Sequence, residues 1–353
     1  MRSVKNIFVD PRSRVLYSSY YIKGLYDCFG REKFSFDIKY FKELNRKDDN
    51  NSYDSYMPFV IKYDNKLVKY IVDFHDKSLI RVNAYDWCDV YAKVNFNKEM
   101  TEKKYHEKIL SIPPGFGIRI WTLWETIYFC ALNYMKCNFS PLVSFKNHLC
   151  DYYWQYKRLS LDEYNSPLHM SKHERFPYVF MIARLWEHAS CVKKANIERK
   201  AFIEACKIAV CNFEGGFLAF KSHPDYKNFI NHIFSVPYSV NDYIKKTRKS
   251  YFVFNNTTMH HCHGWKLGEY LAMSKAMISM PIENDLPEKL VHGINVHFVN
   301  NIDEISEAVS VLLGDVEYVN NLSEGAEKYY NKYVSPASVL NYIINKEVTV
   351  PIL

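Results

Sequence analysis

Short apolar runs alternate with amphipathic stretches through the second half of the chain. An unbroken apolar run is typical of a buried strand, and apolar positions three and four apart are typical of a helix. The predicted strands span 178–183, 216–220, 251–254, 276–280 and 295–299. The predicted helices span 196–210, 239–249, 266–274 and 303–313. Buried strands joined by helical crossovers indicate a parallel sheet with helices on both faces, so we predict a Rossmann-like domain over about residues 171–315.

The first half of the chain has a weaker pattern. A strand at 6–9 precedes a helix at 18–29, and further strands are predicted at 58–61, 67–72 and 109–112. A turn cluster at 113–117 then precedes an aromatic helix that begins near Ile120. A second α/β domain fits this pattern. Residues 169–177 are polar and suit a linker, and helices at 316–331 and 336–345 close the chain.

Composition places the chain among ordinary globular proteins. Of its 353 residues, 48% are apolar and 24% are charged, and this length suits two domains. The nine cysteines form no Cys-x-x-Cys pair, which argues against a disulfide framework or a structural zinc site and favours a reducing cytosol. We expect no signal peptide, and Arg119 and Glu125 interrupt the apolar window 116–135, which argues against a membrane span.

Basic residues concentrate in the first half. The net charge of residues 1–170 is +6, and that of residues 171–353 is +1. This excess suits an anionic surface, a phosphate-bearing substrate or a nucleic acid, and equally a solvated basic face. Because no run is strongly basic and no RNA-recognition signature or zinc finger is present, nucleic acid is not the expected partner.

The segment after the strand at 251–254 holds the first candidate site. In an open parallel sheet, ligands bind beyond the carboxyl ends of the strands. Here a polar loop with one glycine, Gly264, leads into a helix that carries Lys266 and Glu269. A helix N-terminus can hold a phosphate, Lys266 adds a positive charge, and Glu269 can accept hydrogen bonds from a ribose diol. The alternative is a surface carboxylate beside a simple turn.

This helix resembles the donor-site helix of the group-one glycosyltransferases of the GT-B fold. The matching stretch reads Gly264-x-Lys266-x-x-Glu269-Tyr270-Leu271-Ala272-Met273-x-Lys275-Ala276, followed by Ile278-Ser279-x-Pro281. The resemblance implies two Rossmann-like domains that face each other across a cleft. Residues 1–170 would bind the acceptor, residues 171–335 would bind the nucleotide-sugar donor, and the C-terminal helix within 336–353 would return to the first domain.

The resemblance also implies a set of donor-binding residues. Glu269 matches the second of two family glutamates spaced eight apart, which holds the nucleotide ribose, whereas His261 stands in the place of the first. The family's retaining stereochemistry is therefore not implied for this chain. Arg184 and Lys194 are similar to the family's Arg and Lys for the donor diphosphate. The expected donor-binding residues are Arg184, Lys194, His261, His263, Gly264, Trp265, Lys266 and Glu269.

No metal or other cofactor is expected. The range 260–263 holds three histidines and one cysteine, but adjacent residues of one loop rarely all point at one ion. One or two of these histidines are instead expected to line the donor site. The chain also has no Asp-x-Asp, the motif that holds a divalent cation in the other large glycosyltransferase fold.

A second polar cluster follows the predicted strand at 67–72. The range 73–76 places His75 between two carboxylates, of which one is Asp76. An inverting transfer needs a general base for the acceptor hydroxyl, so His75 is the catalytic candidate, with Asp76 beside it. A solvated surface turn is the alternative. Tyr91 and Lys93 either contact the acceptor or belong to an ordinary polar segment.

The sequence thus predicts a cytoplasmic, metal-independent glycosyltransferase that moves a sugar from a nucleotide-sugar donor to an acceptor hydroxyl, in bacterial surface polysaccharide or other glycan assembly. The expected acceptor is a glycan or a lipid-linked glycan. The basic, aromatic first half suits peripheral contact with the inner face of a membrane. Two alternatives stay open: a sugar-nucleotide epimerase of the same two-domain plan, and a non-catalytic nucleotide-sugar-binding module.

Overall fold

The computed structural model describes residues 4–46, 56–64, 66–137, 143–165, 177–209, 211–234, 236 and 238–346. The chain divides into two compact units. The first comprises Met1–Leu161, Asn284–Glu288 and Lys332–Leu353, and the second comprises Asp162–Glu283 and Lys289–Asn331. Both contain β-sheet and helices, which confirms the predicted α/β class. Residues 169–176 of the predicted linker lie outside the described residues.

The first unit is built on a six-stranded sheet in the order β2-β1-β3-β4-β5-β6. Its strands are β1 (Val4–Val9), β2 (Phe34–Phe36), β3 (Tyr56–Tyr63), β4 (Leu67–Asp73), β5 (Val90–Lys93) and β6 (Ile109–Ser111). β3 is antiparallel to both of its neighbours, and the remaining pairs are parallel. The sheet therefore departs from a wholly parallel Rossmann-like arrangement at β3, because β3 and β4 pair as an antiparallel hairpin.

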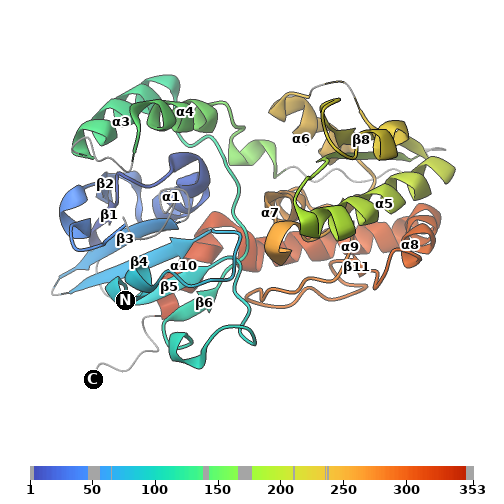
Figure 1. The fold of residues 1–353 in the computed structure, drawn as a ribbon. Helices are drawn as coiled ribbons and strands as arrows, with labels where there is room; N and C mark the ends of the chain where they lie inside the picture. Colours follow the sequence, from blue (N-terminus) through green and yellow to red (C-terminus); the bar gives the residue numbers. More distant parts are fainter. Residues whose placement is uncertain are drawn as a thin grey trace. The chain divides into compact units, whose positions relative to one another are not determined.

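Helices from both ends of the chain complete the first unit. They are α1 (Val15–Phe29), α2 (Val82–Trp87), α3 (Leu123–Lys136), α4 (Phe145–Tyr156) and α10 (Pro336–Lys346). α10 packs against α1 (Figure 1). The two helices meet at Gly24, where an added Cβ would lie 2.3 Å from the Pro336 carbonyl oxygen. Glycine at this position therefore allows the two helices to approach each other closely where they cross.

A buried carboxylate of α4 caps the N-terminus of α1. Asp151 Oδ2 accepts hydrogen bonds from the backbone N–H groups of Val15 at 2.5 Å and Leu16 at 3.2 Å. Its other oxygen accepts from Arg14 Nε at 3.1 Å. Burial raises the pKa of Asp151 to about 6, against the opposing effect of Arg14 and these amides. Asp151 therefore satisfies donors that the first turn of α1 leaves unpaired.

The second unit has parallel strand pairs throughout its described residues, as predicted. Its strands are β7 (Tyr178–Arg184), β8 (Asn212–Leu218), β9 (Val253–Asn255), β10 (Met277–Ser279) and β11 (His297–Phe298). β7 pairs with β8, and β9, β10 and β11 form a second sheet in the order β11-β10-β9. β9 also contacts β7, so the two sheets adjoin at these strands.

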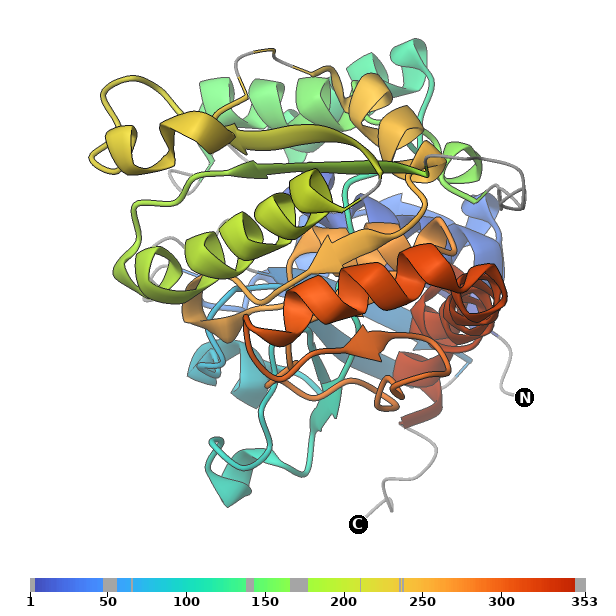
Figure 2. The ribbon, with the colours of Figure 1, turned by 90° about the vertical axis from the view of Figure 1, so that its right-hand side faces the viewer.

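Helices cover the strands of the second unit. They are α5 (Asn196–Ile208), α6 (Val240–Lys249), α7 (Trp265–Ala272), α8 (Glu304–Gly314) and α9 (Val316–Tyr329). α5 and α8 pack side by side over the strands (Figure 2). Phe202 of α5 stacks on Phe254 of β9 with ring centroids 4.8 Å apart, inside the apolar core. No described helix is both long enough and apolar enough to cross a membrane.

Candidate functional site

Polar residues of the second unit gather beyond the carboxyl ends of β7, β9 and β10. Arg184 ends β7, the loop 256–264 joins β9 to α7, and Glu283 follows β10. Open parallel sheets bind ligands at this edge. The segment that the sequence singled out therefore lies where a ligand site is expected.

Asn256 fixes the start of the loop to α5. Its Nδ2 donates to Glu198 Oε2 at 2.8 Å and to the Ala195 carbonyl at 3.1 Å, and its Oδ1 accepts from Arg199 Nε at 2.9 Å. Glu198 and Arg199 are both buried. Burial raises the pKa of Glu198 and lowers that of Arg199, because each charged form is less stable away from water. Buried polar contacts with α5 therefore hold the start of the loop in place.

Glu283 ties the loop to the segment before α5. One of its oxygens, Oε1, lies 2.8 Å from His261 Nδ1 and 2.9 Å from Lys194 Nζ. Burial raises the pKa of Glu283, but hydrogen bonds from Lys194 and His261 outweigh burial and lower it overall. His260 and His261 both have positive φ, 55° and 60°, which L-residues adopt only where the surrounding structure fixes the turn. Two predicted donor residues, Lys194 and His261, therefore meet at one carboxylate.

Lys266 and Glu269 face the body of the unit beneath α7. The Lys266 ammonium is buried although part of the side chain is exposed, and it donates to the Ile182 carbonyl of β7. Glu269 is 5% exposed, and its Oε2 accepts from Tyr243 Oη at 3.2 Å. Burial, assisted by nearby Arg199, lowers the pKa of Lys266 to about 7 despite the attraction of Glu269. A buried amine with this pKa can change its charge near neutral pH.

Gly264 precedes α7 and leaves room beside the helix N-terminus. A Cβ added there would approach only the Lys266 backbone nitrogen, at 4.0 Å. Gly264 is the N-cap residue of this helix and has no side chain with which to cap it. The first N–H groups of α7 and its partial positive charge are therefore suited to an anion.

The other predicted donor residues occupy different surroundings. Arg184 is exposed, and its guanidinium carbon lies 5.9 Å from the centre of the Trp186 ring rather than in either network. His263 is buried and Trp265 is half-buried at the start of α7. The structure thus brings together Lys266 with Glu269, and Lys194 with His261. Sequence reasoning did not single out Glu283, although it follows the predicted strand at 276–280.

The first unit has its own polar network at the matching edge of its sheet. Asp73 ends β4, where Tyr91 Oη donates to its Oδ2 at 2.5 Å and Lys93 Nζ does so at 3.0 Å. All three side chains are fully buried. Tyr91 and Lys93 therefore stabilise the strand ends and offer no exposed surface to an acceptor.

His75 and Asp76 follow this network. The His75 backbone N–H donates to Asp73 Oδ1 at 2.8 Å, and Asn95 Nδ2 donates to the His75 carbonyl at 3.0 Å. His75 Nδ1 accepts from the Lys77 N–H at 3.1 Å, so the neutral ring carries its proton on Nε2 and can donate there. Burial lowers the pKa of His75 despite Asp73, which favours this neutral form. Asp76 is exposed.

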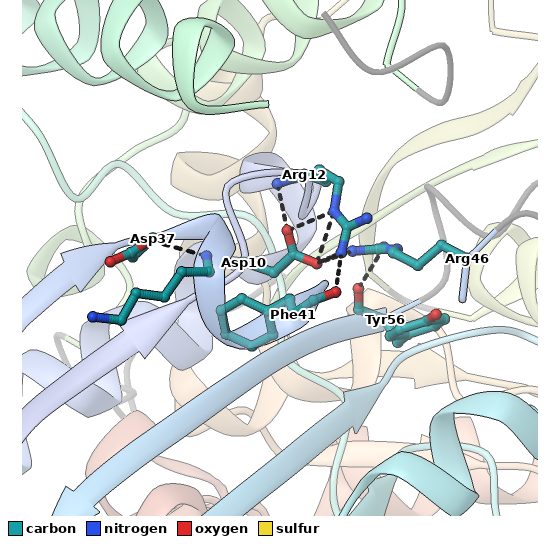
Figure 3. A network of polar contacts seen from close by, with 7 residues as sticks. Asp10, Arg12, Asp37, Phe41, Arg46 and Tyr56 are labelled. Carbon is teal, nitrogen blue, oxygen red and sulfur yellow. Dashed lines mark hydrogen bonds and ion pairs between the residues drawn. The ribbon is translucent and has the colours of Figure 1, made fainter. Parts of the chain in front are cut away.

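An arginine-rich network lies at the end of β1 in the same unit (Figure 3). Asp10 accepts from Arg12 through both oxygens at 2.9 to 3.2 Å and from Arg46 Nη1 at 3.1 Å. Asp10 is fully buried, and although burial raises its pKa, the two guanidinium groups lower it overall. Arg12 also donates to the Phe41 carbonyl at 3.0 Å. The network holds the turn after β1 in place.

The described residues contain no group of three or more His, Cys, Asp or Glu side chains that could hold a metal ion. The histidine-rich loop illustrates why. His261 is engaged by Glu283, and Cys262 Sγ lies 2.9 Å from Thr258 Oγ1, so these two side chains contact different partners.

Comparisons with known proteins give similarity at the level of solved structures. No family model and no curated protein matches the chain. The C-terminal domain of LpcC, a group 1 glycosyl transferase from Francisella tularensis, matches with 15% identity and a TM-score of 0.34, over 44% of this chain and 85% of that domain. A glycosyltransferase from Rickettsia africae matches with 14% identity and a TM-score of 0.42, over 74% of this chain and 63% of that one. HepE from Anabaena, in complex with UDP-glucose, matches with 10% identity and a TM-score of 0.42, over 79% of this chain and 72% of that one.

Proposed function

We propose that the chain is a glycosyltransferase of the GT-B type that transfers a sugar from a nucleotide-sugar donor to an acceptor hydroxyl. The observation that carries the proposal is the pair of Lys266 and Glu269 on α7, close behind the glycine that begins this helix. This place offers an ammonium and backbone amides to a diphosphate, and a carboxylate to a ribose. The chemistry of these residues supports the proposal, and the low-identity similarities are not needed for it.

The donor diphosphate would be held at α7. As the bond between sugar and phosphate breaks, negative charge grows on the departing diphosphate. Lys266 and the first amides of α7 would stabilise that charge without a metal ion, and Arg184 would add a mobile cation from the end of β7. One such group contributes about 2.7 to 4 kcal/mol, so its loss would lower turnover roughly 100- to 1000-fold.

The acceptor hydroxyl would be deprotonated in the first unit. Because His75 Nδ1 already accepts a hydrogen bond, the ring would orient the acceptor by donating from Nε2. The exposed carboxylate of Asp76 would then take the proton. The acceptor class that we propose is a glycan or a lipid-linked glycan of a bacterial surface polysaccharide or another glycan assembly.

Glu269→Gln tests the donor site. UDP-glucose, the ligand of the HepE crystal, is a practical first probe in a panel of nucleotide sugars. We expect the panel to contain a ligand that raises the melting temperature of the wild type, and Glu269→Gln to weaken its binding at least tenfold, because the amide is uncharged and its NH2 group donates where a carboxylate oxygen would accept from the ribose. Release of the nucleoside diphosphate with sugar transfer, followed by mass spectrometry, separates this activity from epimerisation, which keeps the mass of the donor.

Glu214→Gln is the matched control. Like Glu269, Glu214 is a carboxylate that accepts hydrogen bonds from tyrosine hydroxyls, and it also accepts from a lysine. One of these tyrosines is Tyr178, the first residue of β7, whereas the candidate site lies beyond the last residue of that strand. We expect this variant to bind the donor like the wild type. Equal donor binding by Glu269→Gln and the wild type, with circular dichroism showing an intact fold, would overturn the assignment.

A further inference from the structure

The outer faces of α3 and α4 form an apolar surface on the first unit. The two helices pack side by side (Figure 1). A groove of about 470 Å³ runs between them, and Thr126 is the single non-aromatic polar side chain among its described lining residues. Its walls include Leu123, Ile127, Met135, Phe145, Leu149 and Tyr153.

Large aromatic side chains stand exposed beside this groove. Trp124 is 78% exposed, Tyr128 is 60% exposed and Trp154 is 55% exposed. Contiguous exposed apolar area of this kind marks a surface that binds something. Trp and Tyr have an apolar ring and a polar tip, which suits the boundary between hydrocarbon and water.

The charges around the groove are unbalanced in favour of cations. Residues 119–158 include five basic and two acidic side chains. Of the two acids, Asp151 is buried against Arg14, and Glu125 pairs with Arg31 at 2.9 Å. Lys146 and Lys157 are exposed on or directly after α4. An anionic partner would therefore meet cations on this face without exposed, unpaired carboxylates among its described residues.

A second cavity adjoins the groove and has the opposite character. It measures about 450 Å³, shares Leu123 and Tyr156 with the groove, and has Arg119 and the ion pair of Arg31 with Glu125 in its lining. An apolar slot beside a pocket that contains the Arg119 guanidinium, with the one carboxylate among its described lining residues already paired with Arg31, matches a molecule with a hydrocarbon chain and a phosphate head.

We propose that the α3–α4 face docks on a bilayer that contains anionic phospholipids, with acyl chain in the groove and a phosphate headgroup beside Arg119. A second copy of the chain fits less well, because a two-fold interface would set this cationic face against itself. The inference depends on the first unit alone and goes beyond the donor chemistry proposed above.

Vesicle co-sedimentation of the full chain tests this inference. We expect binding to phosphatidylcholine vesicles with about 30 mol% phosphatidylglycerol, weaker binding without the anionic lipid, and loss of binding in about 0.5 M salt. The double variant Trp124→Ser/Trp154→Ser should lose binding at least tenfold, since it removes both indole anchors. Arg119→Ser should lower the partition coefficient about fivefold, as expected for one cation near an anionic surface.

The matched control removes an exposed aromatic from the second unit. Phe220 is 79% exposed, and Phe220→Ser should bind vesicles like the wild type. Absence of binding to anionic vesicles, or equal binding by the wild type and the double tryptophan variant, would overturn the proposal. A wild-type dimer that the double variant makes monomeric in analytical ultracentrifugation, without vesicle binding, would also overturn it. Donor binding, measured separately with UDP-glucose, should be the same in all these variants.

Discussion

The charge of Lys266 predicts how donor binding depends on pH. Its pKa is lowered to about 7, first by burial and then by Arg199. If the protonated amine binds the diphosphate, the protonated fraction of the unliganded protein falls from about 90% at pH 6 to about 10% at pH 8. The apparent affinity should therefore fall about tenfold over this range. Binding at pH 7 to 8 should also take up protons.

Isothermal titration with a nucleotide sugar is the appropriate measurement. UDP-glucose is preferable to UDP, because the terminal phosphate of UDP titrates itself near pH 6. Titration in two buffers of different ionisation enthalpy reports the proton uptake directly. Lys266→Met should bind UDP-glucose more weakly than the wild type at pH 6, and its affinity should not change between pH 6 and 8.

Two results would refute this reasoning. The first is a flat affinity of the wild type between pH 6 and 8, and the second is an unchanged slope in Lys266→Met. His261→Asn changes a residue of the neighbouring loop and leaves Lys266 in place, so this control should keep the pH dependence. The same lowered pKa has a consequence for stability: the folded state binds fewer protons than the unfolded state between about pH 7 and 10.5, so this group should raise the free energy of unfolding as pH rises through that window.

Three further predictions concern single residues. Gly264→Ala should melt like the wild type, because its Cβ enters open space, but should weaken UDP-glucose binding in the same titration. Asp151→Asn should lower the free energy of unfolding by about 1 to 3 kcal/mol in urea. The free energy of unfolding of the wild type should also fall as pH rises from about 4 to 6, because the folded pKa of Asp151 is raised to about 6. Asp151→Asn should lack this contribution, so the same pH dependence in the variant and the wild type would contradict the prediction. Gly24→Ala should lower the free energy of unfolding by about 1 to 3 kcal/mol, because the new methyl group overpacks against α10. Gly314→Ala is the control and should leave the free energy of unfolding unchanged, because no atom lies within 4 Å of its added Cβ.

The strands of the second unit were predictable because their apolar runs are local signals. The predicted strand at 178–183 became β7, and the strand at 276–280 became β10. β8 was placed too late, since it begins at Asn212 instead of residue 216. Gly215 and Gly216 have positive φ within it, and a Cβ on Gly215 would lie 1.8 Å from the Met181 carbonyl. A glycine pair normally indicates a turn, and only the neighbouring strand explains it here.

The first unit was less predictable because its key contacts are distant in sequence. β5 contains Lys93, a residue type that argues against a buried strand until Asp73 is seen to pair with it. α4 carries apolar side chains on its outer face, so its periodicity does not point to the core. In the candidate site, the glycine-helix pattern predicted that Lys266 and Glu269 lie on one helix, which is α7, and their role in donor binding stays a prediction. The link from Glu283 to Lys194 and His261 joins three separate segments, which local pattern cannot show.

The meeting of α1 with α10 has a consequence for biosynthesis. The sheet of the first unit has been translated once residue 161 is made, but the helix that covers Gly24 ends at Lys346. At about 5 to 20 residues per second, the ribosome needs roughly 10 to 40 seconds to supply it. During that interval part of α1 stays uncovered on the nascent chain, so we expect chaperones to engage this helix. A premature stop just before Pro336 should release a chain whose first unit lacks α10, and we expect proteases to degrade it.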